Sequence, residues 1–176
     1  MATTTDVLPD EARAARLRAQ TLVTLLVGYA GYYICRSNFS VVKPLLLAQY
    51  GPLGLTKTHL GWVGTVGTFL YALGKLTNGL TADRRGGRAM FLLGMWASVV
   101  CTVAVGLLAP AMGSLAGLIG VMVVIWSANR YVQSMGWVGL VGVSVRWFPV
   151  SSHATVMGVL SLSYLFGDAF AAAYLG

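Results

Sequence analysis

Five apolar stretches, separated by polar or turn-rich segments, set the pattern of this 176-residue sequence. They cover residues 20–43, 59–81, 89–109, 115–137 and 154–175. Each stretch is long enough to cross a hydrocarbon core of ~30 Å as a helix, which takes ~20 apolar residues. Because no alternating strand pattern accompanies them, the sequence predicts an all-α membrane protein with five transmembrane helices.

The composition agrees with a chain that lies in lipid. Hydrophobic residues make up 57% of it and charged residues 10%, and a soluble domain of this length cannot bury so much apolar surface. Twelve Lys and Arg against five Asp and Glu give a net charge of +7. In a soluble protein this excess would suggest nucleic acid. Here it is better explained by loops that hold the helices against the lipid surface, so the expected partner is the bilayer and no nucleic acid is expected.

Basic residues gather on one side of the predicted bundle. The polar lead, residues 1–19, contains three arginines, and others follow the second and fourth stretches: Arg84, Arg85, Arg88 and Arg146. The opposite side has Lys43 and Lys57. Because cytoplasmic loops hold the excess of Lys and Arg, we expect a multi-pass protein of the cell (inner) membrane with a cytoplasmic N-terminus.

Four ionisable residues interrupt the apolar stretches: Arg36, Lys75, Arg130 and Asp168. Each costs ~2.5–3.5 kcal/mol at the centre of a spanning helix, which makes such residues functional candidates. At ~1.5 Å per residue, Arg36 and Asp168 share a level about 20–24 Å from the cytoplasmic edge. Lys75 and Arg130 are expected about 24 Å from the outer edge, towards the cytoplasm. There a long side chain has the alternative of snorkelling to the interface.

Tyrosines accompany two of these cations. Tyr29, Tyr33 and Arg36 are spaced to share one face of a helix, and Tyr71 lies one turn before Lys75. A tyrosine stripe alone is more often packing, but beside a buried guanidinium it is typical of a polar lining. Arginine offers planar, bidentate hydrogen bonds to phosphate or carboxylate. We therefore interpret this face as part of a site for a small anion.

The segment GLTADRRGGR, residues 79–88, resembles the signature loop of the major facilitator superfamily, Gly-x-x-x-Asp-Arg/Lys-x-Gly-Arg-Arg/Lys. The matching residues are Gly79, Asp83, Arg84, Gly86 and Arg88. Gly87 stands where an arginine is usual. RYVQSMG, which starts at Arg130, is similar to the fourth-helix motif Arg-x-x-Gln-Gly-x-Gly, with Ser134 in place of the first glycine. In that superfamily the arginine is linked to proton coupling, and the resemblance implies this role for Arg130.

Within the superfamily the chain resembles the organophosphate:phosphate antiporters, the glycerol-3-phosphate and hexose-6-phosphate exchangers. The likeness rests on GYAGYYICRSNFSVVKP, YALGKLTNGLTAD and QSMGW, in the first, second and fourth stretches. It implies that Arg36 is a phosphate ligand. It also implies that the same cavity is lined by Tyr29, Tyr33, Tyr71, Lys75 and Trp137. The fifth-helix histidine of the glycerol-phosphate type falls on Tyr164, and Asp168 lies in the glycine-rich stretch that follows.

Asp168 has three interpretations. Because it is expected at the level of Arg36, it could neutralise that guanidinium when no substrate is bound. It could instead titrate as a proton-coupling acid, which an exchanger does not need. The third interpretation is a carboxylate bonded to helix-end or loop groups near the outside.

These observations predict a secondary transporter rather than an enzyme, with no cofactor and no metal site. Its substrate is expected to be a phosphorylated small anion, exchanged for inorganic phosphate by alternating access. One alternative is a proton-coupled carrier of another organic anion or drug, with Asp168 and Arg130 in the coupling. Another is a non-transporting membrane scaffold. Because facilitators have two six-helix halves, residues 20–176 are interpreted as an N-terminal domain truncated before its sixth helix, and the missing C-terminal half as its partner.

Overall fold

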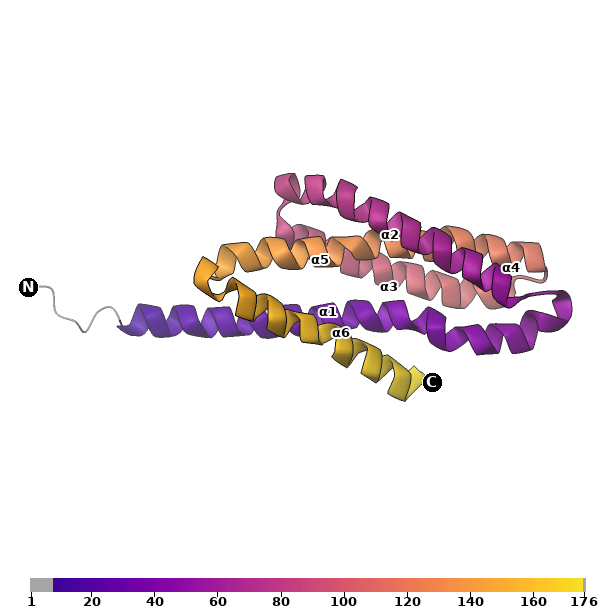
Figure 1. Cartoon of the computed structure of the whole chain (residues 1–176), viewed down its shortest axis with the longest axis horizontal. Coiled ribbons are helices and arrows are strands. Elements are labelled where there is room, and N and C mark those ends of the chain that lie inside the picture. The colour runs from indigo at the N-terminus through magenta and orange to yellow at the C-terminus, as the bar shows by residue number, and fades with distance from the viewer. Residues whose placement is uncertain (1–7, 176) are drawn as a thin grey trace, which may run out of the picture.

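The computed structural model describes residues 8–175, in which long antiparallel helices run along one axis (Figure 1). The major helices are α1 (Leu8–Tyr50), α2 (Lys57–Arg85), α3 (Gly87–Ala111), α5 (Ser127–Trp147) and α6 (His153–Leu175). A short helix α4 (Leu115–Val121) continues through a π-helical segment η2 (Met122–Trp126) into α5. Single 3₁₀ turns η1 (Gly51–Leu53) and η3 (Val150–Ser152) precede α2 and α6. No strand occurs in residues 8–175, which confirms the predicted all-α class.

Helix α5 lies at the centre of the bundle and packs against both α2 and α3. Helix α6 packs along α1, and its C-terminal part diverges from the other helices (Figure 1). By length and apolar composition, three of the described segments qualify as membrane spans: Gly87–Ala111, Leu115–Trp147 and Val150–Ala171. Helices α1 and α2 are also long, but their sequences include more polar and charged residues. The sequence pattern predicts five equal spans, but the helices differ in hydropathy. By this measure α3, α4–α5 and α6 qualify as spans, and α1 and α2 do not.

Several helices extend beyond the apolar stretches that predicted them. Helix α1 begins at Leu8 rather than near residue 20, and it continues through Pro44 to Tyr50. The added N-terminal turns are rich in alanine, arginine and leucine, which favour helix without any apolar pattern. The fourth stretch, predicted to end at 137, reaches Trp147. Residues 1–7 of the predicted lead lie outside the described part of the chain.

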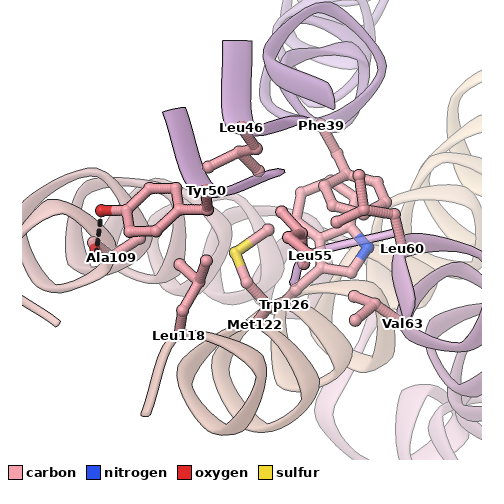
Figure 2. Close-up of a cluster of buried hydrophobic side chains, with 10 residues drawn as sticks. All are labelled: Phe39, Leu46, Tyr50, Leu55, Leu60, Val63, Ala109, Leu118, Met122 and Trp126. Carbon is pink, nitrogen blue, oxygen red and sulfur yellow. Dashed lines mark hydrogen bonds between the residues drawn. The ribbon is translucent and has the colours of Figure 1, made fainter. Parts of the chain in front are cut away.

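One apolar cluster closes the end of the bundle where α1 turns into α2 (Figure 2). Its buried members come from α1, the following turn, α2, α3, α4 and η2: Phe39, Leu46, Tyr50, Leu55, Leu60, Val63, Ala109, Leu118, Met122 and Trp126. The ring centroids of Phe39 and Trp126 lie 4.7 Å apart. Tyr50 Oη donates a hydrogen bond of 3.2 Å to the carbonyl of Ala109, which ties the end of α1 to α3.

A second apolar cluster lies nearer the other end of the bundle and joins α1, α3, α5 and α6. Its buried members are Leu25, Tyr29, Tyr32, Phe91, Leu140, Val156 and Leu160. Tyr32 Oη donates a hydrogen bond of 2.6 Å to the carbonyl of Phe91, so this phenol is part of the packing. On α1, Arg36 lies between Tyr32 of the second cluster and Phe39 of the first. The two clusters therefore enclose a middle level that contains the helix-borne charges.

The turn between α2 and α3 is a single residue, Gly86, with φ of +81°. A side chain would be strained in this conformation, so glycine is required there. At the next position, Gly87, an added Cβ would lie 2.7 Å from the carbonyl oxygen of Gly139 and from the backbone of Gly142. Helices α3 and α5 thus meet backbone to backbone, as small residues allow in membranes. This contact gives a physical reason for glycine where the signature loop usually has arginine.

We expect Gly87→Ala to destabilise the folded chain by ~1–3 kcal/mol, because the new methyl group overpacks the contact between α3 and α5. Gly87→Arg, which restores the usual residue of the signature loop, is expected to cost at least as much. Denaturant-induced unfolding of the purified chain in detergent, followed by tryptophan fluorescence, measures both effects.

The matched control is Gly106→Ala on the same helix, because a Cβ at Gly106 has no neighbour within 4 Å. Its stability should be unchanged, or raised by up to ~1 kcal/mol through helix propensity. Equal effects at the two glycines would contradict the backbone contact between α3 and α5.

Candidate functional site

Three cations from three helices converge on the ring of Tyr71. Arg36 Cζ on α1 lies 5.6 Å from the ring centroid, Lys75 Nζ on α2 lies 5.1 Å away, and Arg130 Cζ on α5 lies 4.8 Å away. These distances are within the ~6 Å range of cation–π attraction. We call Arg36, Lys75, Arg130 and Tyr71 the cation cluster.

The lengths of the helices explain why these residues meet. Arg36 lies 14 residues before the end of α1, and Tyr71 lies 14 residues after the start of α2. Arg130 lies 15 residues after the start of α4, at the same end of the bundle (Figure 1). Each residue adds ~1.5 Å along a helix, so residues that are equally many positions from the same end of the bundle lie at the same level.

Counted from the end of the bundle at the α1–α2 turn, Lys75 and Arg130 lie near their predicted level, and the predicted level of Arg36 is wrong. Helix α1 continues to Tyr50, so Arg36 lies ~21 Å from that end and level with Arg130. The prediction counted from the ends of the apolar stretches. The helices extend beyond those stretches by unequal lengths, so such counts do not share an origin.

Arg36 is half-buried and lies against aromatic faces. Its Cζ is 5.3 Å from the ring centroid of Tyr33, in addition to its contact with Tyr71. Within the described residues no salt bridge or hydrogen bond engages its guanidinium. Five N–H donors in a rigid fork are thus available to an anion.

Arg130 is only 6% exposed, so its side chain does not snorkel to an interface. Its Nη1 donates to Oε1 of Gln133 at 3.1 Å, and Gln133 Nε2 donates to Ser98 Oγ on α3 at 3.1 Å. Ser98 Oγ in turn donates to Oδ1 of Asn129 at 2.7 Å. This series of buried hydrogen bonds fixes the side-chain amide of Gln133, which holds Arg130, because each of the bonded polar atoms has a partner.

The positively charged side chains of the cation cluster repel one another. The Cζ atoms of Arg36 and Arg130 lie 5.6 and 4.8 Å from one centroid, so they are no more than roughly 10 Å apart. At an effective dielectric constant of ~20, like charges at that separation repel by at least ~1.6 kcal/mol. No carboxylate forms a salt bridge with these cations in residues 8–175. A multivalent anion would relieve this repulsion and accept hydrogen bonds from both guanidinium groups.

Aromatic side chains predicted to line the site form one continuous group. The ring centroid of Tyr29 lies 5.4 Å from that of Tyr33 and 5.8 Å from that of Trp137. Tyr33 lies 5.9 Å from Tyr164 of α6. Tyr29 is only 6% exposed and belongs to the second apolar cluster, so its main contribution is packing. Tyr33 and Trp137 are half-buried and Tyr164 is exposed.

Asp168 forms no salt bridge with Arg36 among the described residues, which is the pairing that the first of its three interpretations requires. Its carboxylate accepts a hydrogen bond from the hydroxyl of Ser37, the residue that follows Arg36. Asp168 is exposed on α6, and its hydrogen bond with Ser37 connects α6 to α1. The carboxylate lies next to Arg36 in level, as the sequence predicted, and its role as a proton-coupling acid stays a prediction.

The signature loop lies at the opposite end from the α1–α2 turn. Gly79, Asp83 and Arg84 are in the last turns of α2, Gly86 forms the turn, and Arg88 is in the first turn of α3. Asp83, Arg84 and Arg88 are exposed. Arg84 lies nine residues after Lys75 on α2, which is ~13 Å of helix, so the exposed charges of the loop lie away from the cation cluster.

Two polar residues that position Arg130, Ser98 and Asn129, were missed from the sequence, and Gln133 of the fourth-helix motif was given no role. Their spacing could have indicated them, because Asn129 and Gln133 are one turn apart, as are Ser98 and Thr102 on α3. Asn129 Nδ2 donates to Thr102 Oγ1 at 3.2 Å.

Ser134, which replaces a glycine of the fourth-helix motif, also has a structural role. It accepts a hydrogen bond of 2.8 Å from Asn78 of α2.

Two cavities of the described residues lie away from the cation cluster. One, of about 450 Å³, is lined mainly by apolar residues of α1, α3 and η2. The other, of about 810 Å³, lies beside the signature loop. Neither is lined by Arg36, Lys75 or Arg130. Within residues 8–175 no group of three His, Cys, Asp or Glu side chains is placed to hold a metal ion.

Comparison with known proteins identifies relatives that match most of this chain over part of their own length. It is 29% identical over 157 residues to the glycerol-3-phosphate transporter of Bacillus subtilis (strain 168), covering 89% of this chain and 34% of that protein. It is 29% identical over 153 residues to the glycerol-3-phosphate transporter of Haemophilus influenzae, covering 86% and 30%. The hexose-6-phosphate:phosphate antiporter of Escherichia coli (strain K12) is 24% identical over 153 residues, covering 87% and 32%.

The chain spans about a third of the length of the curated relatives it matches. No solved structure gives a significant match. The profile of the Major Facilitator Superfamily matches residues 25–176, which include the cation cluster and the signature loop. The helical bundle and the predicted likeness to organophosphate:phosphate antiporters agree with that match. This chain belongs to the Major Facilitator Superfamily.

Proposed function

We propose that this chain supplies part of the anion site of a secondary transporter, which exchanges a phosphorylated small organic anion for inorganic phosphate. The observation that supports this most strongly is the cation cluster, in which Arg36, Lys75 and Arg130 surround Tyr71 and no carboxylate of residues 8–175 forms a salt bridge with them. A phosphomonoester has the charge and the acceptor oxygens that such a group requires.

Each cation of the cluster has a distinct role in this proposal. Arg36 is the direct phosphate ligand, because its donors have no protein partner among the described residues. Arg130 is held by Gln133 and supplies a fixed positive charge. Lys75 is exposed and flexible, so it can follow the anion as it enters or leaves.

Alternating access supplies the transport step. In facilitators a site near the bilayer midplane is exposed to one side and then the other as two halves rock about it. Because this chain matches about a third of its relatives' length, the second half of the site is proposed to come from the remaining part of the carrier. This proposal requires both parts for transport, whereas anion binding depends on the cluster itself.

A second candidate function is proton-coupled transport of an organic anion. The observation in its favour is the exposed Asp168, whose carboxylate is bonded to Ser37 beside the phosphate-ligand candidate. A carboxylate at that position would gain and lose a proton close to the anion. Exchange driven by phosphate does not need such a group.

We expect Arg36→Gln to weaken binding of inorganic phosphate to the purified chain by at least tenfold. Loss of a charge-assisted hydrogen bond costs ~1.5–3 kcal/mol, which corresponds to roughly 10- to 150-fold in Kd. Isothermal titration calorimetry in a neutral detergent measures this change.

Lys43→Gln is the control, because it removes a cation from the same helix. Lys43 Nζ lies over the ring of Phe39 at 4.8 Å, outside the cation cluster. Its phosphate affinity should match that of the unmodified chain. Similar losses in both variants would refute a specific role for Arg36.

For the carrier that contains this sequence, we expect Asp168→Asn to retain uptake of a sugar or glycerol phosphate into phosphate-loaded proteoliposomes. A pH gradient without internal phosphate should drive little uptake in either protein. Ser37→Ala, which removes the hydrogen-bond partner and keeps the carboxylate, is the matched variant. If a pH gradient alone drives uptake and Asp168→Asn abolishes it, the proton-coupled function replaces the exchange proposal.

A further inference from the structure

A cavity of about 810 Å³ lies at the end of the bundle that contains the signature loop. It is formed between the N-terminal half of α1, the α2–α3 turn and the end of α5. Its volume falls within the ~300–1,000 Å³ typical of small-molecule sites. The cation cluster is elsewhere, because Leu25, the cavity residue nearest to Arg36 on α1, precedes it by about 16 Å of helix.

Three arginines from separate segments line this cavity: Arg85, Arg88 and Arg146. All three are exposed, and no salt bridge or hydrogen bond engages their guanidinium groups among the described residues. No aspartate or glutamate lines the cavity. Arg85 ends α2, Arg88 starts α3 and Arg146 nearly ends α5, so their convergence follows from tertiary packing.

Most of the remaining lining is apolar, and its polar members are Gln20, Thr21 and Thr24 of α1. Leu25, Phe91 and Val143 form part of the wall. At the rim Leu92 is 44% exposed and Trp147 is 43% exposed. Tryptophan at a helix end is typical of the boundary between lipid and water. The cavity thus combines a positively charged region with an apolar wall at the level of lipid headgroups.

We propose that this cavity binds one anionic phospholipid, with its headgroup phosphate held by Arg85, Arg88 and Arg146. The acyl chains lie along the apolar wall beside Leu92 and Trp147. Basic pockets between helices at a membrane surface are suited to anionic headgroups. A lipid matches the volume and the apolar wall, which a free phosphate ion would leave uncovered. The proposed lipid site is independent of the transport function proposed above.

The test measures binding of phosphatidylglycerol to the purified chain by native mass spectrometry. Phosphatidylcholine with the same acyl chains and inorganic phosphate are the comparison ligands. The key variant replaces Arg85, Arg88 and Arg146 with glutamine. Each basic residue near a lipid surface contributes roughly fivefold in affinity, so the triple variant should lose on the order of 100-fold.

The matched control replaces Arg13, Arg16 and Arg18 with glutamine. These residues lie on α1 at the same end of the bundle and do not line the cavity, so the change in net charge is identical. The control should lose less than the contribution of one lipid-contacting arginine, about fivefold, because none of its three arginines lines the cavity. A third variant with lysine at the three cavity positions should retain most binding, because it keeps the charge.

Selective retention of phosphatidylglycerol, lost in the cavity variant and kept in the control, supports the proposal. Equal losses in both triple variants would indicate diffuse surface attraction and overturn it. Equal binding of phosphatidylcholine, or displacement of the lipid by inorganic phosphate, would also overturn it. If the glutamine triple fails to fold, the three single variants decide the question, each with an expected loss of about fivefold.

Discussion

The repulsion among Arg36, Lys75 and Arg130 is the constraint on which the rest of this structure depends. Arg130 is buried and Arg36 is half-buried beside one phenol ring, so both lose solvation, and no carboxylate forms a salt bridge with the three cations in residues 8–175. The ring of Tyr71 and the amide of Gln133 offset part of that cost. The remainder must come from the surrounding packing, and the anion proposed above would supply the missing negative charge.

Two features of the scaffold hold the cluster in place. Apolar clusters on either side of the middle level fix α1 against α3 and α5. Close contacts at glycine bring the helices together, since a Cβ at Gly67 would lie 3.0 Å from Cγ of Arg130. The π-helical segment η2 ends immediately before the turn that contains Arg130, and such segments change the direction of the side chains that follow. Trp126 in η2 packs on Phe39, which links this change in α5 to α1.

The fold class and the candidate charges could be predicted from the sequence, because apolar length and an isolated guanidinium are strong local signals. The meeting of Lys75 and Arg130 with Arg36 could not, because hydropathy marks the lipid-facing part of a helix and not its true ends. The glycine at Gly87 was read as a departure from a motif, and only the approach of α5 gives it a reason. The bond from Ser37 to Asp168 depends on the rotation of α6 about its axis, which a uniformly apolar helix leaves unspecified.

Whether the cations act on one anion can be measured by a double-mutant cycle on phosphate affinity. Calorimetry would compare the chain with Arg36→Gln, Arg130→Gln and the double variant. If both guanidinium groups bind the same anion, the double variant should depart from the sum of the single effects by about 1 kcal/mol or more. Strict additivity within ~0.3–0.5 kcal/mol, or no effect of Arg130→Gln, would contradict a shared anion site.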